Sequence, residues 1–491
     1  MTTTMMNVTT THIRRTPAAN ELAFGEDLEA SLARLRGLQA AEGIPSYETR
    51  IHRLKRLKSA LLVRKHEIAA AVSRDFGHRS RHESLMAEVF FTLRAIDYTI
   101  SHLHGWMKVR RRPVSWLFPM GRACVAYQPL GVVGIISPWN YPVHLALAPL
   151  ATAIAAGNRV MLKPSELTPT TSRLLEELLM EALGPEVASV ITGGPATGAA
   201  FARLPFDHLF FTGSTRVARL ILRDAAEHLT PATLELGGKS PAIIGKDFPS
   251  EKAAGRIMTG KLFNAGQTCL APDHALVPAG RMGEFVAACC QAVAAMYPSL
   301  TGNDDYTSII NDDHYRRLES YVADARARGA DVIEINPQAE APDRVGRKFF
   351  PTLIANATPE MLVMKEEIFG PILPIMSYAS LSEAIAFVNA NPRPLALYYF
   401  GYDGRDIDEV INSTMSGGVT INETCLHAAL DDLPFGGVGP SGMGEYHAFE
   451  GFETFSKKRA IFRQGPIDTG RFLRPPFAGA VDRALNLMLG R

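Results

Sequence analysis

The chain has 491 residues, of which 46% are hydrophobic and 21% charged, a composition typical of globular proteins and not of disordered or fibrous ones. Lys and Arg together number 51 and Asp and Glu 50, so the formal net charge is only +1. A broad nucleic-acid-binding face needs a basic surplus, and a membrane-spanning helix needs about 20 apolar residues without charges or turn breakers. The sequence has neither feature, so we expect no nucleic-acid partner and no integral membrane association.

The cysteines are few, odd in number and never spaced as C-x-x-C. This pattern disfavours a disulfide framework and favours free thiols in a reducing compartment, so we expect a cytoplasmic protein. One C-x-H pair, Cys425 and His427, is too sparse to bind a metal, and we expect no metal site. The five cysteines are Cys124, Cys269, Cys289, Cys290 and Cys425.

The first 20 residues contain no apolar segment, and we expect them to form a disordered tail. In residues 21–112 apolar side chains recur at helical spacing, which predicts helices, one of them with a basic, solvated face at 50–65. From about residue 123, short β-rich runs alternate with helical runs, which predicts parallel strands in doubly wound sheets. The predicted strands are 132–136, 159–162, 189–191, 208–211, 332–335, 352–354, 372–376 and 397–400. The predicted helices are 143–156, 169–183, 195–203, 215–228, 250–265, 280–297, 314–328 and 382–390.

Two segments are candidates for a phosphate-binding loop. The only G-x-G-x-x-G, residues 437–442, contains a proline and does not lie between a predicted strand and helix, so we interpret it as a tight loop. Gly213 and Ser214 instead follow a predicted strand and open a predicted helix, where backbone N–H groups and hydroxyls suit a phosphate. An ordinary helix cap explains this second segment equally well.

Four further segments carry chemistry, and three of them have a structural alternative. Asn140 lies between two prolines after a strand and presents an amide, although a contact with local backbone is the simpler interpretation. Lys163 and Glu166 end a strand and suit ribose hydroxyls, or form a surface ion pair. Glu235 lies between leucines, where burial raises a carboxyl pKa and favours a general base. Cys269 follows a bend, although a lone thiol is usually inert.

Seven segments in order resemble the NAD(P)-dependent aldehyde dehydrogenase superfamily. The similarity extends from about residue 45 to 463, and its ending, 417–427 and 433–461, is most similar to the class 3 branch and to coniferyl aldehyde dehydrogenases. The segments are SPWNYP, AAGNRVMLKPSE, FFTGSTRVA, LELGGKSP, FNAGQTC, EEIFGPILP and LPFGGVGPSGMG.

The resemblance implies a mechanism and a set of site residues. Cys269 would attack the aldehyde to give a thiohemiacetal and then a thioester, the Asn140 amide would hold the oxyanion, and Glu235 would activate the hydrolytic water. The substrate would be an aromatic or α,β-unsaturated aldehyde packed on Tyr141 and Phe435. The implied cofactor is NAD, with NADP possible, and its implied contacts are Trp139, Lys163, Glu166, Gly213, Ser214, Leu236, Glu367 and Phe369.

The resemblance also implies two tandem doubly wound α/β domains with a small β oligomerisation arm, and therefore a homodimer. The expected divisions are a tail at 1–20, a Rossmann-like NAD(P)-binding domain at 21–113 and 131–236, a catalytic domain at 237–436, an arm and closing segment at 114–130 and 437–465, and a C-terminal tail at 466–491. In that last tail we expect Val481, Leu485 and Leu489 to dock on the protein itself or on a neighbouring subunit, because the apolar run is too short to cross a bilayer.

Other functions remain open from the sequence. A general aliphatic aldehyde dehydrogenase has the same motifs. A coenzyme-A-acylating relative typically lacks the water-activating glutamate, and Glu235 is present. A binding protein on an inactive scaffold conflicts with the retained Cys269, Glu235 and Asn140. A thiol hydrolase without a dinucleotide needs a histidine base, for which the motifs offer no candidate.

Overall fold

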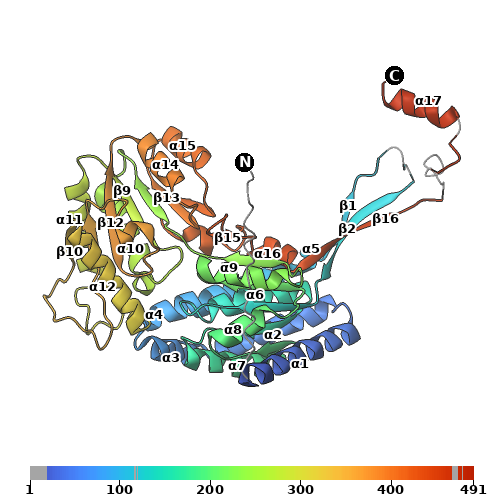
Figure 1. Ribbon diagram of the computed structural model, residues 1–491, viewed down its shortest axis with the longest axis horizontal. Coiled ribbons are helices and arrows are strands. Elements are labelled where there is room, and N and C mark those ends of the chain that lie inside the picture. The colour runs from blue at the N-terminus through green and yellow to red at the C-terminus, as the bar shows by residue number, and fades with distance from the viewer. Residues whose placement is uncertain (1–18, 116–117, 119, 467–473, 478, 491) are drawn as a thin grey trace, which may run out of the picture.

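The computed structural model describes residues 19–115, 118, 120–466, 474–477 and 479–490, and its strands form three sheets. Two lobes and a projecting arm make up the molecule (Figure 1). Most of the tail expected at 1–20 lies outside the described residues, and helix α1 begins at Ala19.

The N-terminal segment is helical, as predicted. Leu54, Leu57 and Leu61 are fully buried, which is the apolar face that the spacing indicated. The helices are α1 (Ala19–Glu42), α2 (Tyr47–Val63), α3 (Lys65–Phe76), α4 (Arg81–Ser84), the π-helical turn η1 (Leu85–Phe90) and α5 (Phe91–Trp106).

Arg50 departs from the solvated basic face predicted for α2. Its side chain is buried, and it donates hydrogen bonds to Ala155 O at 2.9 Å and Pro45 O at 3.1 Å. The guanidinium therefore satisfies a carbonyl in the last turn of helix α6 (His144–Ala156), which has no partner within its own helix. The prediction was wrong at this position because the partner lies 105 residues away in the chain.

The first lobe contains a six-stranded sheet in the order β15-β7-β6-β3-β4-β5. Its strands are β3 (Val132–Ile136), β4 (Arg159–Lys163), β5 (Ala188–Val190), β6 (His208–Thr212), β7 (Ala232–Glu235) and β15 (Gly442–Met443). The strand order reverses at β3, between β4 and β6, and ligands of open α/β sheets bind at such a switch point. The loops that follow β3 and β6 therefore open into one crevice. The remaining helices are α7 (Pro169–Leu183), α8 (Pro195–Ala202) and α9 (Thr215–Ala226).

The second lobe contains a seven-stranded sheet in the order β10-β11-β12-β9-β8-β13-β14. Its strands are β8 (Pro241–Ile244), β9 (His274–Pro278), β10 (Asp331–Glu334), β11 (Thr352–Ala355), β12 (Ile372–Tyr378), β13 (Ala396–Phe400) and β14 (Gly418–Ile421). Its helices are α10 (Ser250–Leu262), α11 (Met282–Met296), α12 (Asp312–Ala327), α13 (Leu362–Lys365), α14 (Leu381–Ala390) and α15 (Gly404–Ser413).

The prediction of doubly wound α/β sheets is confirmed, with two exceptions at sheet edges. Strand β10 pairs with β11 antiparallel, and β15 pairs with β7 antiparallel. No helix lies between β10 and β11, and parallel neighbours normally need such a crossover. The loop at 437–442 is tight, as expected, because Gly439 bridges to Gly442, the first residue of β15.

The arm is a three-stranded antiparallel sheet of β1 (Arg110–Arg112), β2 (Arg122–Pro129) and β16 (Ser456–Arg463). Helix α16 (Ala448–Thr454) directly precedes β16. It projects from the body, and helix α17 (Gly479–Met488) lies beyond its tip (Figure 1). Leu485 and Leu489 are 45% and 72% exposed, so the expected docking of this tail on its own chain is wrong. In the described part of the chain, no helix is long and apolar enough to cross a membrane.

Candidate active site

A cavity of about 500 Å³ brings together residues from both lobes. Glu235, at the end of β7 in the first lobe, and Cys269, in the loop after α10 in the second, both line it. Tyr141 and Phe435 line the same cavity, as does Leu236. The structure therefore places the two candidate reacting groups and both candidate aromatic side chains around one cavity.

Glu235 is a buried carboxylate without hydrogen-bond partners. Its side chain is 2% exposed, and neither carboxylate oxygen has a partner among the described residues. Burial raises its pKa well above the ordinary value, and the charge of Glu445 adds to this. A carboxylate in such surroundings readily accepts a proton, which is the property a general base requires.

Cys269 follows a strained loop. Asn264 and Ala265 have φ values of +54° and +51°, a left-handed conformation that non-glycine residues rarely adopt. The Glu83 carboxylate holds this loop by accepting from Asn264 N at 3.1 Å. Burial raises the pKa of the Cys269 thiol, and the charges of Glu367 and Glu235 raise it further. The neutral thiol is therefore the resting form, and its proton must be removed before it can attack.

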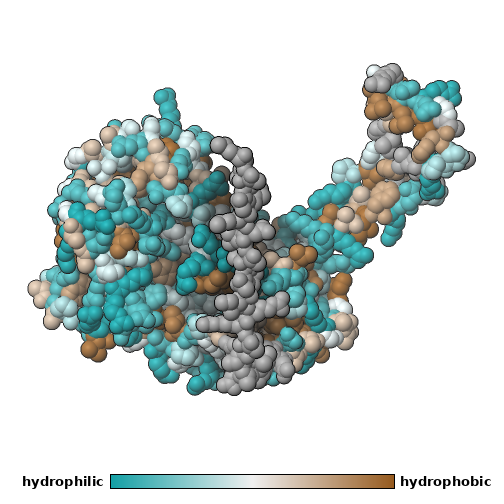
Figure 2. Space-filling model, viewed as in Figure 1, coloured by the Kyte–Doolittle hydropathy of each residue, from teal (hydrophilic) through white to brown (hydrophobic). Residues whose placement is uncertain are grey.

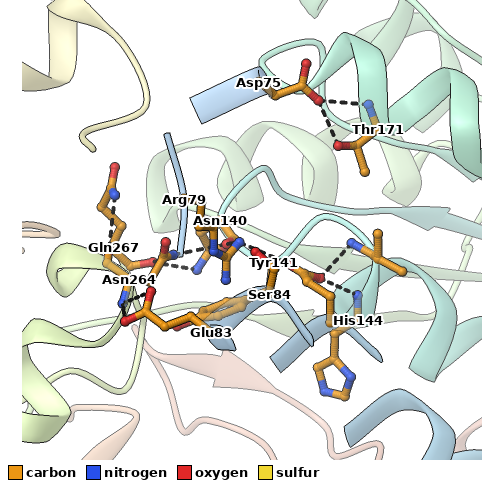
Figure 3. A network of polar contacts seen from close by, with 12 residues as sticks. Asp75, Arg79, Glu83, Ser84, Asn140, Tyr141, His144, Thr171, Asn264 and Gln267 are labelled. Carbon is orange, nitrogen blue, oxygen red and sulfur yellow. Dashed lines mark hydrogen bonds and ion pairs between the residues drawn. The ribbon is translucent and has the colours of Figure 1, made fainter. Parts of the chain in front are cut away.

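Asn140 is directed at the cysteine loop and not at its own backbone. Its Nδ2 donates to Gln267 O at 3.1 Å, two residues before Cys269. An amide nitrogen has two N–H donors, so this bond leaves one for a ligand. Asn264 Nδ2 in turn donates to Asn140 O at 3.1 Å, so the two loops are joined twice (Figure 3). The simpler interpretation, a contact with local backbone, is thereby wrong.

A buried ion pair behind these loops was missed by sequence reasoning. Arg79 and Glu88 are both fully buried and lie 2.8 Å apart. Arg79 also donates to Asn140 O at 2.9 Å, and Glu88 accepts from the backbone N–H groups of Val143 and His144 at 3.0 and 2.9 Å (Figure 3). The pair therefore fixes the loop that carries Asn140 at both ends. Arg79 lies in the linker between α3 and α4 and Glu88 in η1, and charged residues at such positions are usually solvated, so no local pattern distinguishes them.

Lys163 and Glu166 form the ion pair that was the alternative interpretation, with Nζ and Oε2 2.9 Å apart. The Lys163 side chain is buried at the end of β4, whereas the Glu166 side chain is 38% exposed. Ser214 caps helix α9 by accepting from Val217 N at 3.4 Å. The N–H of Gly213 donates to Glu235 O at 3.0 Å and so is already engaged.

Glu367 and Phe369 come from the second lobe, and Trp139 comes from the first-lobe loop after β3. The Glu367 carboxylate accepts from Gly238 N at 3.2 Å, and burial with the nearby Asp273 raises its pKa to about 7. A Cβ on Gly237 would lie 2.1 Å from Glu367 Oε1, so any larger residue there would displace the Glu367 carboxylate. The rings of Trp139 and Phe369 meet edge to face with centroids 5.4 Å apart.

Most of the residues that line the cavity were not identified from the sequence, and three of them carry chemistry close to the reacting groups. Cys425, which the sequence excluded only as a metal ligand, lines the cavity with Cys269. His144 and His447 line it too. The sequence offered one signal for His144: this residue lies two positions after the SPWNYP segment.

Comparisons with known proteins agree with this geometry. The sequence profile of the aldehyde dehydrogenase family matches residues 5–461. A "Probable coniferyl aldehyde dehydrogenase" of Pseudomonas aeruginosa is 47% identical over 94% of this chain and 96% of that protein. The "Coniferyl aldehyde dehydrogenase" of Pseudomonas sp. (strain HR199) has the same identity and coverage.

Solved structures have the same architecture. A substrate-bound structure of Staphylococcus aureus AldH has a TM-score of 0.89 and 35% identity, covering 94% of this chain and 99% of that one. An NAD-dependent aldehyde dehydrogenase from Sinorhizobium meliloti has a TM-score of 0.82 at 28% identity and covers 92% and 89%. With a family profile that spans most of its length and a cysteine and glutamate facing one cavity, this chain belongs to the aldehyde dehydrogenase family.

Proposed function

We propose that this enzyme oxidises an aromatic or α,β-unsaturated aldehyde, such as coniferyl aldehyde, to the carboxylic acid with NAD(P)+. The observation that carries the proposal is the shared cavity, in which Cys269 and Glu235 lie with the aromatic side chains of Tyr141 and Phe435. Aromatic walls favour a planar conjugated substrate, which packs on them by stacking or edge contacts. The similarity to two coniferyl aldehyde dehydrogenases supports the same substrate class.

The residues present fit a nicotinamide dinucleotide. Lys163 has three N–H donors and uses one on Glu166, so both side chains keep hydrogen-bonding capacity for a ribose. One Glu367 carboxylate oxygen accepts from Gly238 N, and the other remains available to a ribose hydroxyl. Gly237 has no side chain that would displace this carboxylate. When bound, the nicotinamide ring supplies the acceptor for the hydride.

The first half of the reaction takes place on Cys269. The Cys269 thiol first loses its proton to solvent water, because the neutral thiol is the resting form. The thiolate sulfur then attacks the carbonyl carbon, and the free N–H of Asn140 together with the backbone N–H of Cys269 holds the resulting oxyanion. One such donor typically contributes about 2.7–4 kcal/mol to the transition state. Loss of hydride then leaves a thioester on the sulfur.

The second half depends on Glu235. Its unpartnered carboxylate takes a proton from a water molecule, which attacks the thioester and releases the carboxylic acid. The raised pKa of Glu235 makes it a stronger base than an exposed carboxylate, provided that the pH is high enough to ionise it. Hydrolysis, and not transfer to coenzyme A, is therefore the expected fate of the thioester.

An aldehyde panel tests the substrate assignment. Benzaldehyde, cinnamaldehyde, hexanal and succinic semialdehyde are each offered with NAD or NADP, and formation of the reduced cofactor is followed. We expect the highest kcat/KM for cinnamaldehyde. A clearly higher value for hexanal or succinic semialdehyde would assign the enzyme to aliphatic aldehydes instead.

NAD is the proposed cofactor, because the exposed carboxylate of Glu166 repels a 2′-phosphate. The test is Glu166→Gln, for which we expect a rise in kcat/KM with NADP relative to NAD. Solved relatives include both an NAD-dependent and an NADP-dependent enzyme, so the fold accommodates either. An unchanged ratio would remove Glu166 from this role.

A homodimer formed through the arm is also part of the proposal. The arm exposes apolar side chains, with Ile461 and Phe462 38% and 52% exposed, and Figure 2 shows apolar residues along it. Light scattering with the double variant Ile461→Ser/Phe462→Ser tests this, and we expect the mass to fall from two chains to one. The proposed cytoplasmic location is consistent with five free cysteines and is tested by cell fractionation.

A further inference from the structure

We propose that His144 selects substrates with a ring hydroxyl, by accepting a hydrogen bond from that hydroxyl at Nε2. The inference rests on the proposed aromatic aldehyde oxidation and names the substrate feature that the cavity recognises. The ligand class is therefore a phenolic aldehyde.

The backbone places His144 along the cavity from the reacting groups. Leu145 N donates to Tyr141 O at 3.0 Å, so the chain is already helical here, and one helical turn advances about 5.4 Å. His144 thus lies roughly one turn beyond Asn140, and it lines the same cavity as Cys269. Its backbone N–H donates to Glu88, and its imidazole projects away from the buried network (Figure 3).

The hydrogen bonds around Thr92 determine the tautomer of His144. The Thr92 hydroxyl has one proton, which it donates to Glu88 O at 2.7 Å. The contact between Thr92 Oγ1 and His144 Nδ1, at 2.9 Å, must then use a proton on Nδ1. A neutral imidazole with its proton on Nδ1 carries a lone pair on Nε2. Burial lowers the pKa of His144 to about 4, so the ring is neutral at physiological pH.

The lone pair of Nε2 has no protein donor among the described residues. The surrounding cavity wall is mostly apolar and includes Phe91, Leu145 and Ala148. An acceptor in such surroundings gains most from a ligand that brings its own donor, since leaving it unsatisfied costs free energy. A phenol provides an O–H donor on a flat ring that fits between Tyr141 and Phe435.

His447 differs from His144 because no hydrogen bond to a described residue fixes its tautomer. It also lines the cavity, but its ring is stacked on Phe435 with centroids 4.9 Å apart, and its Nδ1 has no partner in the described chain. Nothing fixes which of its nitrogens carries the proton. Of the two histidines that line the cavity, His144 is therefore the one with a directed acceptor.

The test compares three substrates of nearly equal size: 4-hydroxycinnamaldehyde, 4-methoxycinnamaldehyde and cinnamaldehyde. The hydroxyl group donates a hydrogen bond, the methoxy group does not, and cinnamaldehyde has neither. His144→Phe keeps a ring but removes the acceptor, whereas His144→Gln keeps an acceptor oxygen. Glu88 contacts only the backbone of residue 144, so both variants retain that bond.

We expect His144→Phe to lower kcat/KM for 4-hydroxycinnamaldehyde by about three- to tenfold, the range of one neutral hydrogen bond, chiefly by raising KM. Values for the methoxy and unsubstituted aldehydes should stay within about twofold, and His144→Gln should recover part of the loss. Thr92→Val removes the contact that keeps the His144 proton on Nδ1. This variant should lower kcat/KM for the hydroxylated substrate alone, by less than His144→Phe does.

Two results would overturn the inference. Equal losses for all three substrates would make His144 a packing residue, and no loss for the hydroxylated one would remove it from recognition. In either case, oxidation of cinnamaldehyde by the unaltered enzyme would leave the proposed function intact. If that enzyme oxidises hexanal but none of the three cinnamaldehydes, the proposed function fails and this inference fails with it.

Discussion

Two regions of the molecule bury carboxylates, which are hydrogen-bonded in one region and unpartnered in the other. Glu83 and Glu88, behind the active-site loops, accept hydrogen bonds from backbone N–H groups and from Thr307 or Arg79. Glu235, in the cavity, accepts none from the described residues. A satisfied buried charge fixes structure, whereas an unsatisfied one is costly to the fold and is retained where chemistry uses it.

The largest effect should follow removal of the nucleophile. Cys269→Ala should abolish turnover, because no other thiol is held by the Asn140 and Gln267 loop. The free energy of unfolding should change by only about 1 kcal/mol, since the thiol has few structural duties. Steady-state assay and urea unfolding measure the two effects. Substantial residual turnover would transfer the chemistry to another residue, with Cys425 examined first.

Removal of the oxyanion donor should have the next largest effect. Asn140→Ala should lower kcat by about 10²–10³-fold, the usual effect of one such donor. KM should change little, because the interaction forms mainly in the transition state. A loss confined to KM would make Asn140 a binding residue only.

The supporting region should respond in stability. Glu88→Gln breaks a fully buried ion pair and should lower the free energy of unfolding by about 3–5 kcal/mol. Glu319→Gln removes the exposed partner of Arg344 and should cost at most about 1 kcal/mol. Urea denaturation of both variants tests this contrast, which equal losses would refute.

The smallest effect concerns pH and cofactor affinity. The pKa of Glu367 is raised to about 7, so this carboxyl is protonated below pH 7 and ionised above it. Ionisation strengthens the hydrogen bonds that the remaining Glu367 oxygen accepts from ribose hydroxyls, so the Kd for NAD should fall by up to about tenfold from pH 6 to 8. Calorimetric titration measures it, and Glu367→Gln should flatten the dependence. A pH dependence that survives this substitution would come from another group.

The candidate site was largely predictable because its members occur in short contiguous strings. Cys269, Glu235 and Asn140 each lie in a segment whose family resemblance is visible without knowledge of the fold. The network behind them was not predictable. Arg79 meets Asn140 across 61 residues of chain, and only the packed fold brings them together.

Parts of the fold were also not predictable from local sequence patterns. Strands β8 and β9 were not predicted, although they lie at the centre of their sheet and are buried throughout. Both runs are buried throughout and show no alternation, so periodicity alone does not distinguish a strand from a buried helix there. The longer alternating segments from 132 to 226 carried their own helix and turn signals, and they were predicted correctly.

The most direct test of the unsatisfied carboxylate is rapid mixing of Glu235→Gln with cinnamaldehyde and NAD. Glutamine keeps the shape of the side chain but cannot accept a proton from water. We predict a burst of reduced cofactor close to one equivalent per active site, followed by turnover about 10²–10⁴-fold slower than that of the unaltered enzyme. A steady-state rate equal to that of the unaltered enzyme, with no burst, would contradict the assignment of Glu235 as the base that hydrolyses the thioester.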